Sequence, residues 1–212
     1  MLTDSVYDII KEEILGLQFE AGQALVERDL SDQLGVSKTP VREALLRLTN
    51  EGFLTRTSSR RLVVKQVTQQ EIEDIYSLRE VLERMAVTLS VPKLLDEDFQ
   101  ALEQHLRSAK VSMDLGDRSA TAKFNRHYHM VFAARSGNQL LEEILSGMQD
   151  KVRIISVLGW RVVPSMADEY DEHVGVLNAA KDGRADEAGQ LMAEHIHRFK
   201  LLFGKAATDA NH

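Results

Sequence analysis

From residue 68 onwards the apolar residues recur at intervals of three and four, and no alternating strand pattern competes with that spacing. The first long stripe consists of Ile72, Ile75, Leu78, Leu82, Met85 and Leu89. Such a stripe predicts a helix that buries one face against other helices. With 3 prolines and 12 glycines among 212 residues, the chain has few residues that favour sheet turns. The sequence therefore predicts a mostly α fold, in which residues 68–212 form an antiparallel all-α helical bundle.

Breaks between the predicted helices fall at capping residues, glycines and prolines. Thr68 and Glu71 have the spacing of a capping box, so the first helix of the bundle is expected to begin after Thr68. Later interruptions fall at Pro92, Gly116, Pro164 and Gly183. The further helices are expected from Asp96 or Asp98, over 119–134, from after Asn138 to 158, over 170–181, and from 185 to about 203.

Residues 1–67 have a different pattern, in which two short helices are joined by a glycine. An apolar stripe predicts a helix over residues 3–16, and a second helix is expected to start at Leu25 and end at Gly35. Ser37 or Thr39 can cap a third helix, with Pro40 in its first turn. This arrangement is typical of a helix-turn-helix, whose second helix presents its N-terminal residues to bases in the major groove. Here those residues are Lys38, Thr39 and Arg42.

Two short apolar stretches follow, residues 53–56 and 61–64, with residues 57–60 between them. Paired strands joined by a turn predict a wing, so residues 1–67 are expected to form a winged helix-turn-helix. The formal net charge of the chain is −7, but residues 37–65 carry seven basic and two acidic residues. This local excess is the footprint of DNA binding, although a solvated surface would also produce a run of charges.

Composition excludes several other classes of protein. The chain has no cysteine, so it holds no disulfide, no thiolate zinc site and no cysteine nucleophile. It has neither an N-terminal signal pattern nor an apolar run approaching the roughly 20 residues that span a bilayer. We therefore expect a soluble cytoplasmic protein that does not contact a membrane.

The chemistry of the helical half lies in its histidines. Asn125 and His129 are four residues apart and share one helix face, while His173 and His195 lie on the last two predicted helices. Neutral imidazoles that converge with an oxygen ligand could hold a divalent ion such as Zn or Ni. Spacing alone is a weak signal, because any single histidine is more often solvated or hydrogen-bonded.

Residues 36–45 (Val-Ser-Lys-Thr-Pro-Val-Arg-Glu-Ala-Leu), with Arg47-Leu48 and Glu51-Gly52-Phe53-Leu54, closely resemble the GntR family of transcription regulators. The resemblance covers about residues 6–67 and implies DNA contacts from Glu27 or Arg28, Ser37, Lys38, Thr39, Arg42 and Arg47. The wing departs from the family pattern, because Ser58-Ser59-Arg60-Arg61 stands where the tip is usually Gly-Arg-Gly. Glycine allows a close approach to a groove, so Arg60 and Arg61 are expected to contact phosphates or a narrow groove instead.

The helical half resembles the ligand-binding domain of the FadR subfamily, called FCD, over residues 72–203. The motifs are residues 79–83 (Arg-Glu-Val-Leu-Glu), 124–129 (Phe-Asn-Arg-His-Tyr-His), Ser136-Gly137-Asn138, Glu172-His173 and Glu194-His195. Many members hold a metal through an aspartate, a histidine four residues later and two histidines on the last two helices. The resemblance thus implies a divalent metal on His129, His173 and His195, with Asn125 at the aspartate position. Because the asparagine oxygen is neutral, we expect weaker metal binding.

Arg79 resembles the arginine that lines the cavity in this subfamily, and Arg153 is a second candidate. A guanidinium beside a metal suits a carboxylate, because the guanidinium and the metal can each bind its two oxygen atoms. The expected effector is therefore a small organic acid. Arg79 could instead pair with Glu83, one turn along the same helix.

Together these features predict a homodimeric regulator whose two recognition helices bind successive major grooves of a pseudo-palindromic operator. Repression relieved by the effector is the commoner family behaviour and is expected here. Two alternatives stay open. The metal itself could be the signal, or the three histidines could form an enzyme site with Glu172 or Glu194 beside the ligands. The enzyme is disfavoured because no His-Glu-x-x-His motif appears and an enzyme has no need of a helix-turn-helix.

Overall fold

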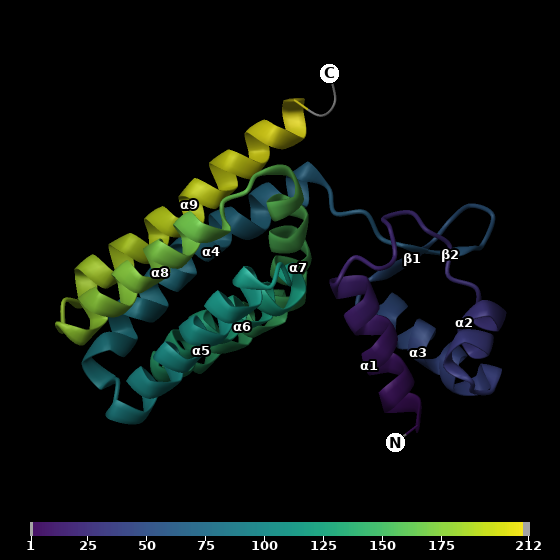
Figure 1. Ribbon diagram of the computed structural model, residues 1–212, viewed down its shortest axis with the longest axis horizontal. Helices are drawn as coiled ribbons and strands as arrows, with labels where there is room; N and C mark the ends of the chain where they lie inside the picture. Colours follow the sequence, from purple (N-terminus) through teal and green to yellow (C-terminus); the bar gives the residue numbers. More distant parts are fainter. Residues whose placement is uncertain (1, 210–212) are drawn as a thin grey trace. The chain divides into compact units, whose positions relative to one another are not determined.

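The computed structural model describes residues 2–209, without the side chains of residues 2, 3, 162 and 204–209. Met1 and residues 210–212, the outer limits of the two predicted domains, lie outside the described residues. The structure divides into two compact units, residues 1–67 and 68–212, and each is described by itself (Figure 1). The predicted fold class, mostly helical with a small N-terminal hairpin, is confirmed. Among the described residues, no helix is both long and apolar enough to cross a membrane.

The first unit is a winged helix-turn-helix. It consists of α1 (Leu2–Leu15), α2 (Glu27–Leu34), α3 (Lys38–Asn50), β1 (Leu54–Arg56) and β2 (Leu62–Val64). The strands pair antiparallel with Thr55 opposite Val63. Gly35 ends α2 with a φ of 65°, a left-handed conformation that favours glycine. Ser37 is the N-cap residue of α3, as one of the two sequence alternatives predicted.

The predicted start of the second helix at Leu25 was wrong, because the chain is still extended there. Ala24 forms an isolated bridge with Val63, and the Leu25 amide donates a hydrogen bond to the Leu62 carbonyl over 3.0 Å. These backbone groups join the segment before α2 to the wing. The first helical residue is therefore Glu27, which lies next to the hairpin.

The second unit is a helical bundle. Its elements are α4 (Gln69–Ser90), a 3-10 turn (Val91–Lys93), α5 (Asp96–Asp114), α6 (Arg118–Arg135), α7 (Gln139–Val162), α8 (Met166–Lys181) and α9 (Ala185–Asp209). The capping box predicted at Thr68 is present, since the Thr68 hydroxyl accepts from the Glu71 amide and the Glu71 carboxylate accepts from the Thr68 amide. Helices α7 and α9 continue past their predicted ends, and α8 begins four residues earlier than predicted.

Helix α4 lies at the centre of the bundle and packs against α6, α7 and α9, while α8 packs against α5 and α9 (Figure 1). Gly189 permits a close approach of α9 to α4: a Cβ at this position would lie 2.3 Å from the Thr88 hydroxyl and 3.0 Å from the Arg84 carbonyl oxygen. Side chains from α4 and α9 therefore meet in the interior with little space between the backbones.

The buried face of α4 differs from the predicted apolar stripe. Leu78 and Met85 are 45% and 44% exposed, whereas Arg79 and Glu83 are buried. The interior side of the helix passes instead through Ile72, Tyr76, Arg79, Glu83, Ala86 and Val87. Charged residues can be buried there because they pair with each other and with a histidine of α6.

Candidate DNA-binding groove and metal centre

A basic groove of 560 Å³ lies between the start of α2, the start of α3 and the wing. It brings together six of the nine residues predicted to contact DNA: Glu27, Arg28, Lys38, Arg42, Arg60 and Arg61. Arg56 of β1 also lines it and was missed as a site residue, although its charge contributed to the basic segment in the sequence. Ser37 and Thr39 are exposed at the start of α3 but do not line this groove.

Glu27 holds the Arg42 side chain in a defined orientation. The Glu27 carboxylate accepts hydrogen bonds from Nε and Nη2 of Arg42, with 2.9 Å between Oε2 and Nη2. The hydrogen bond from Arg42 lowers the pKa of the Glu27 carboxyl, and Glu27 raises the pKa of Arg42. Arg42 remains 67% exposed, so its other N–H groups can still reach a DNA base or phosphate.

Arg47 lies outside the groove, against the N-terminal helix. Its guanidinium stacks over the Tyr7 ring at 3.7 Å and donates from Nε to Glu51 over 3.0 Å. The Tyr7 hydroxyl donates to the other oxygen of the same carboxylate. Arg47 thus connects α1 with the end of α3. A DNA contact from this residue stays a prediction.

The wing turn keeps the backbone shape of a glycine without containing one. Arg60 has a φ of 62°, in the left-handed region that residues with a Cβ rarely adopt. Its amide donates to the Thr57 carbonyl over 2.8 Å, and the Thr57 amide donates to the Arg61 carbonyl. These bonds close the turn and leave both arginine side chains in the lining of the groove.

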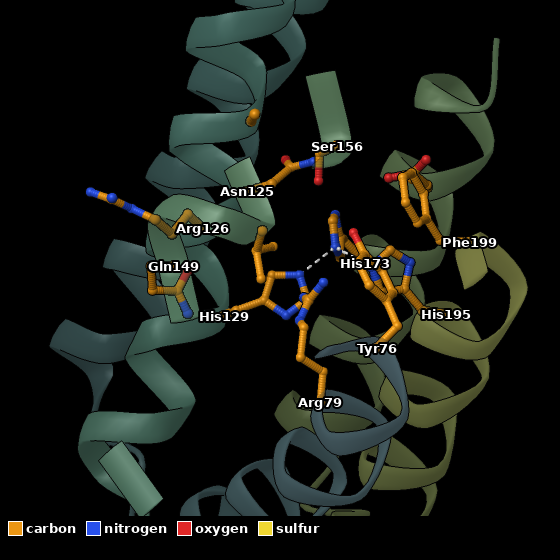
Figure 2. Close-up of a pocket in the computed structure, with 13 residues that line it drawn as sticks. Tyr76, Arg79, Asn125, Arg126, His129, Gln149, Ser156, His173, His195 and Phe199 are labelled. Carbon is orange, nitrogen blue, oxygen red and sulfur yellow. Dashed lines mark hydrogen bonds between the residues drawn. The ribbon is translucent and has the colours of Figure 1, made fainter. Parts of the chain in front are cut away.

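In the second unit, three histidines from three helices converge on one point. His129 of α6, His173 of α8 and His195 of α9 are all buried. The Nε2 atom of His173 lies 3.0 Å from that of His129 and 3.1 Å from that of His195 (Figure 2). In tetrahedral zinc sites with Zn–N distances of about 2.0–2.1 Å, neighbouring nitrogen atoms are about 3.3 Å apart. The cluster therefore fits a metal ion with only small adjustments.

Carboxylates orient two of the three imidazoles. Nδ1 of His195 lies 2.8 Å from Glu172, and Nδ1 of His129 contacts Glu83. A carboxylate at Nδ1 favours the proton on that nitrogen, which leaves the lone pair on Nε2 facing the centre of the cluster. Burial lowers the pKa of both His173 and His195, with a further contribution from neighbouring histidines. Neutral imidazoles are the form that binds a metal.

Asn125 and Arg79 line the same cavity as the histidines. Asn125 precedes His129 by one helical turn, and its amide forms no hydrogen bond within residues 2–209. Arg79 donates from Nε to Glu83 over 2.6 Å and lies over the Tyr76 ring. The two interpretations of Arg79 are thus compatible, because it pairs with Glu83 and also faces the cavity.

Glu83 joins this arginine to the histidine cluster. One of its oxygens accepts from Arg79 and the other contacts Nδ1 of His129. Burial opposes the ionisation of Glu83, but Arg79 and His129 outweigh it, so the pKa of Glu83 is lowered well below its ordinary value. The carboxylate is therefore ionised, and it contacts two residues that line the cavity, Arg79 and His129.

Arg153 is not among the residues that line the cavity. Its Nη2 donates to the Ser119 hydroxyl over 2.8 Å, and the side chain is buried. Two charged residues that the sequence patterns did not indicate line the cavity, Arg126 and Glu169. Glu169 precedes His173 by four residues on α8, the same spacing that relates Asn125 to His129. That spacing is the signal that could have found it.

The cavity has a volume of only 20 Å³. This is enough for about one water-sized group. The pocket therefore has room for a small ion or a water between the histidines and Arg79, and a larger ligand needs the surrounding helices to separate.

Comparison with known proteins identifies both units. The family model described as "Bacterial regulatory proteins, gntR family" matches residues 2–64, and the model described as "FCD domain" matches residues 74–198. The HTH-type transcriptional regulator McbR of Escherichia coli K12 is 31% identical over 201 residues, which cover 92% of this chain and 91% of McbR. The HTH-type transcriptional repressor GlaR of the same organism is 26% identical over 202 residues, 90% of each chain.

A solved structure described as E. coli McbR/YncC superposes with a TM-score of 0.80. The superposition covers 97% of this chain and 98% of the solved chain at 24% sequence identity, so the similarity supports the fold. The two family matches follow the order of the units along the chain, DNA-binding unit first and helical bundle second. The chain therefore belongs to the GntR family of bacterial transcription regulators, with a C-terminal FCD domain, and is a DNA-binding regulator rather than an enzyme.

Proposed function

We propose that the protein is a repressor that binds a pseudo-palindromic operator as a dimer and responds to a small organic acid held at a divalent metal ion. The observation that carries the effector part is the convergence of three imidazole Nε2 atoms beside Arg79 in one buried cavity. Zn or Ni suits nitrogen ligands of this kind, with Asn125 as a fourth, neutral ligand. Repression is proposed because relatives such as GlaR are named repressors.

The DNA contacts are proposed to come from the basic groove of the first unit. Lys38 and Arg42 stand at the start of α3, where a recognition helix meets base edges. Arg60 and Arg61 of the wing turn supply positive charge for phosphates. Glu27 acts through Arg42, since both of its oxygens accept from that guanidinium, Oε1 from Nε and Oε2 from Nη2. Arg28, Ser37, Thr39 and Arg56 complete the proposed interface.

The dimer is proposed to form through the helical bundle, where α4 has an exposed apolar stripe. Leu78, Val81 and Met85 are 45%, 66% and 44% exposed and lie on neighbouring turns of one helix. Such a stripe on an amphipathic helix is what a second copy would cover by two-fold symmetry. Val81→Arg is expected to give a monomer in light scattering. Val111→Arg, which changes an exposed valine on α5, is the control and should remain dimeric.

Effector binding is proposed to change helix packing. A carboxylic acid is larger than the 20 Å³ cavity, so its entry must separate side chains contributed by α4, α6, α7, α8 and α9. A ligand that favours this wider arrangement shifts the population of the dimer towards it. The free energy of operator binding then changes by at most the difference between the effector's binding free energies for the two arrangements.

The experiment that tests the proposal begins with the DNA fragments that the metal-loaded protein selects from its source genome. Discrete palindromic sites are expected, and a screen of small carboxylates should then raise the thermal stability and weaken operator binding. His129→Gln should lose the carboxylate response but keep the sites. His197→Gln changes an exposed histidine that contacts Glu80 and should behave as wild type. Diffuse, salt-sensitive DNA binding alone, or a response unchanged in His129→Gln, would contradict the proposal.

A second candidate is favoured by the size of the cavity, which has room for an ion with only small adjustments of the histidines. In this case the metal itself is the signal. Removing the metal with a chelator would then abolish or restore operator binding when no organic acid is present. An operator affinity that is the same with and without metal, but falls with a carboxylate, would favour the first candidate.

A further inference from the structure

Leu46 is an apolar residue on the outward side of α3, for which neither the core nor the predicted DNA contacts supply a role. It is 55% exposed, more than any other large apolar residue that the structure describes in the first unit. The buried side of α3 consists of Pro40, Val41, Ala44, Leu45 and Leu48. Leu46 therefore contributes little to the core, although single exposed apolar residues are common on protein surfaces.

The position of Leu46 on the helix distinguishes it from a scattered surface residue. With about 3.6 residues per turn, Leu46 lies about 40° from Arg42 and about 20° from Thr39 around the helix axis. Thr39 and Arg42 are exposed residues of the same helix, and both stand among the residues proposed to contact DNA. Leu46 thus lies between them on the side opposite the core. A recognition helix turns this side towards the base edges of the major groove.

The two arginines beside Leu46 are held by other residues. The Arg42 guanidinium donates to Glu27 of α2, and the Arg47 guanidinium lies over the Tyr7 ring of α1. Leu46 does not line the basic groove, and neither does Thr39, so the outward side of α3 extends beyond that groove. An apolar side chain therefore stands in the middle of this outward side, with the nearest positive charges fixed at its edges.

We propose that Leu46 reads thymine, by contacting the C5-methyl group of a thymine in the major groove of the operator. The inference rests on specific operator binding by α3, which is part of the proposed function. The thymine methyl is the apolar group that the major groove presents to a protein, and contact with leucine removes apolar surface of both from water. Leu46 lies about 6 Å along the helix from Arg42. Since bases are about 3.4 Å apart along a strand, the thymine is expected about one or two base pairs from the base that Arg42 contacts.

The contact can be removed from either partner. Leu46→Ala shortens the side chain and keeps the helix, because alanine has the highest helix propensity. Deoxyuridine pairs as thymine does but lacks the methyl group. Each change alone should weaken operator binding about fourfold, the effect of losing one buried methyl group. Made together they should cost no more than one of them, since each removes the same contact.

The test begins with selection of high-affinity sites from a random-sequence duplex library by the full-length protein. Each thymine of the selected site is then replaced by deoxyuridine, one at a time, and binding is measured by fluorescence anisotropy at one salt concentration. In wild type we expect a thymine in each half-site whose replacement weakens binding about fourfold. The same replacement should have little effect on Leu46→Ala. Ile9→Ala removes an exposed apolar side chain from α1 and should respond to deoxyuridine as wild type does.

The results that would overturn the inference differ from those that would overturn the operator. Equal effects of deoxyuridine on wild type and Leu46→Ala at every thymine, or a selected site without thymine, would remove the contact and leave specific DNA binding intact. Failure to enrich any sequence from the library would refute the specific operator, and the reading of thymine by Leu46 with it.

Discussion

The Nε2 atoms of His173 and His195 lie 3.1 Å apart, although their imidazoles come from two different helices. Without a metal, a neutral His173 can donate from Nε2 to the lone pair of His195, and its Nδ1 then has no hydrogen-bond partner among the described residues. Burial lowers the pKa of both residues, so both imidazoles stay neutral, the form that binds a metal. A metal ion bound by both Nε2 atoms would replace that hydrogen bond and join α8 to α9. The histidine cluster therefore also connects α8 with α9, and both helices line the cavity.

Glu83→Gln should weaken metal binding, because the carboxylate holds Nδ1 of His129. Loss of such a partner typically lowers metal affinity about 10–100-fold. Competition with a chelating dye would measure the affinity for zinc. Glu80→Gln is the matched control, since Glu80 lies on the same helix and contacts His197 and Lys200 away from the cluster. Equal zinc affinity in Glu83→Gln and wild type would show that Glu83 does not orient the ligand.

Glu169 should make the stability of the metal-free protein depend on pH. Its carboxyl titrates at about 7 in the folded chain and near 4.5 when unperturbed. Between these values the folded state keeps a proton that the unfolded state has released, so stability falls as pH rises through this window and levels off above it. The loss amounts to about 3 kcal/mol.

Glu169→Gln should lack this loss, so its stability relative to wild type should rise by about that amount from acidic to alkaline pH. Urea denaturation at both ends of the window measures the difference. Asp168→Asn, which removes an exposed carboxylate from the same helix, should show no comparable trend. A difference in stability between Glu169→Gln and wild type that is the same at all pH values would refute the raised pKa of Glu169.

Gly159 is a packing requirement of the cavity wall. A Cβ at this position of α7 would lie 2.6 Å from Cζ of Phe199, a ring that lines the cavity and stacks on Tyr76. Gly159→Ala should therefore destabilise the bundle by about 1–3 kcal/mol, the usual result of overpacking. Gly175→Ala on α8 meets nothing within 4 Å and should stabilise its helix by about 0.5–1 kcal/mol. Thermal unfolding should show a lower stability than wild type for Gly159→Ala and a higher one for Gly175→Ala. A change of stability in the same direction for both variants would contradict this packing.

Arg60 combines backbone strain with a charge in the groove. Its φ of 62° costs a residue with a Cβ about 1 kcal/mol or more. Arg60→Gly should relieve that strain and raise stability by up to about 1 kcal/mol, while it weakens DNA binding and reduces the salt dependence. Arg56→Ala, which lines the same groove from a strand, should lower DNA affinity without the gain in stability. A destabilised Arg60→Gly protein would contradict the strained turn.

Glu27→Gln should loosen the Arg42 side chain, because the charged fork between them is lost. We expect operator affinity to fall and discrimination between operator variants to narrow by about 1 kcal/mol, as for one charge-assisted hydrogen bond. Binding measurements on single-base operator variants would show this. Asp29→Asn alters an exposed acid on the same helix and should leave discrimination unchanged. Better discrimination in Glu27→Gln would contradict a positioning role.

Much of this arrangement could be predicted because it depends on local spacing. The turn at Gly35, the cap at Thr68 and the shared face of Asn125 and His129 follow from a few neighbouring residues. The convergence of His173 and His195 needed the resemblance to the FadR subfamily, because they come from separate helices.

The rest depends on contacts between distant segments. Leu25 is extended because its amide bonds to the wing, and Arg47 leaves the groove because Tyr7 attracts its guanidinium. Glu169 is buried because α7 supplies Trp160 as a donor. Leu78 and Met85 are exposed because α4 uses Arg79 and Glu83 on its interior face. Each outcome required partners whose positions local sequence patterns do not give.

The central claim is tested most directly by counting the divalent metal that the full-length protein binds. Equilibrium dialysis against zinc or nickel should give one tightly held ion per chain in wild type and in His197→Gln. It should give a greatly weakened site in His129→Gln, with circular dichroism showing that the bundle remains folded. A wild type that binds no ion, or a His129→Gln protein that binds as tightly as wild type, would contradict the account.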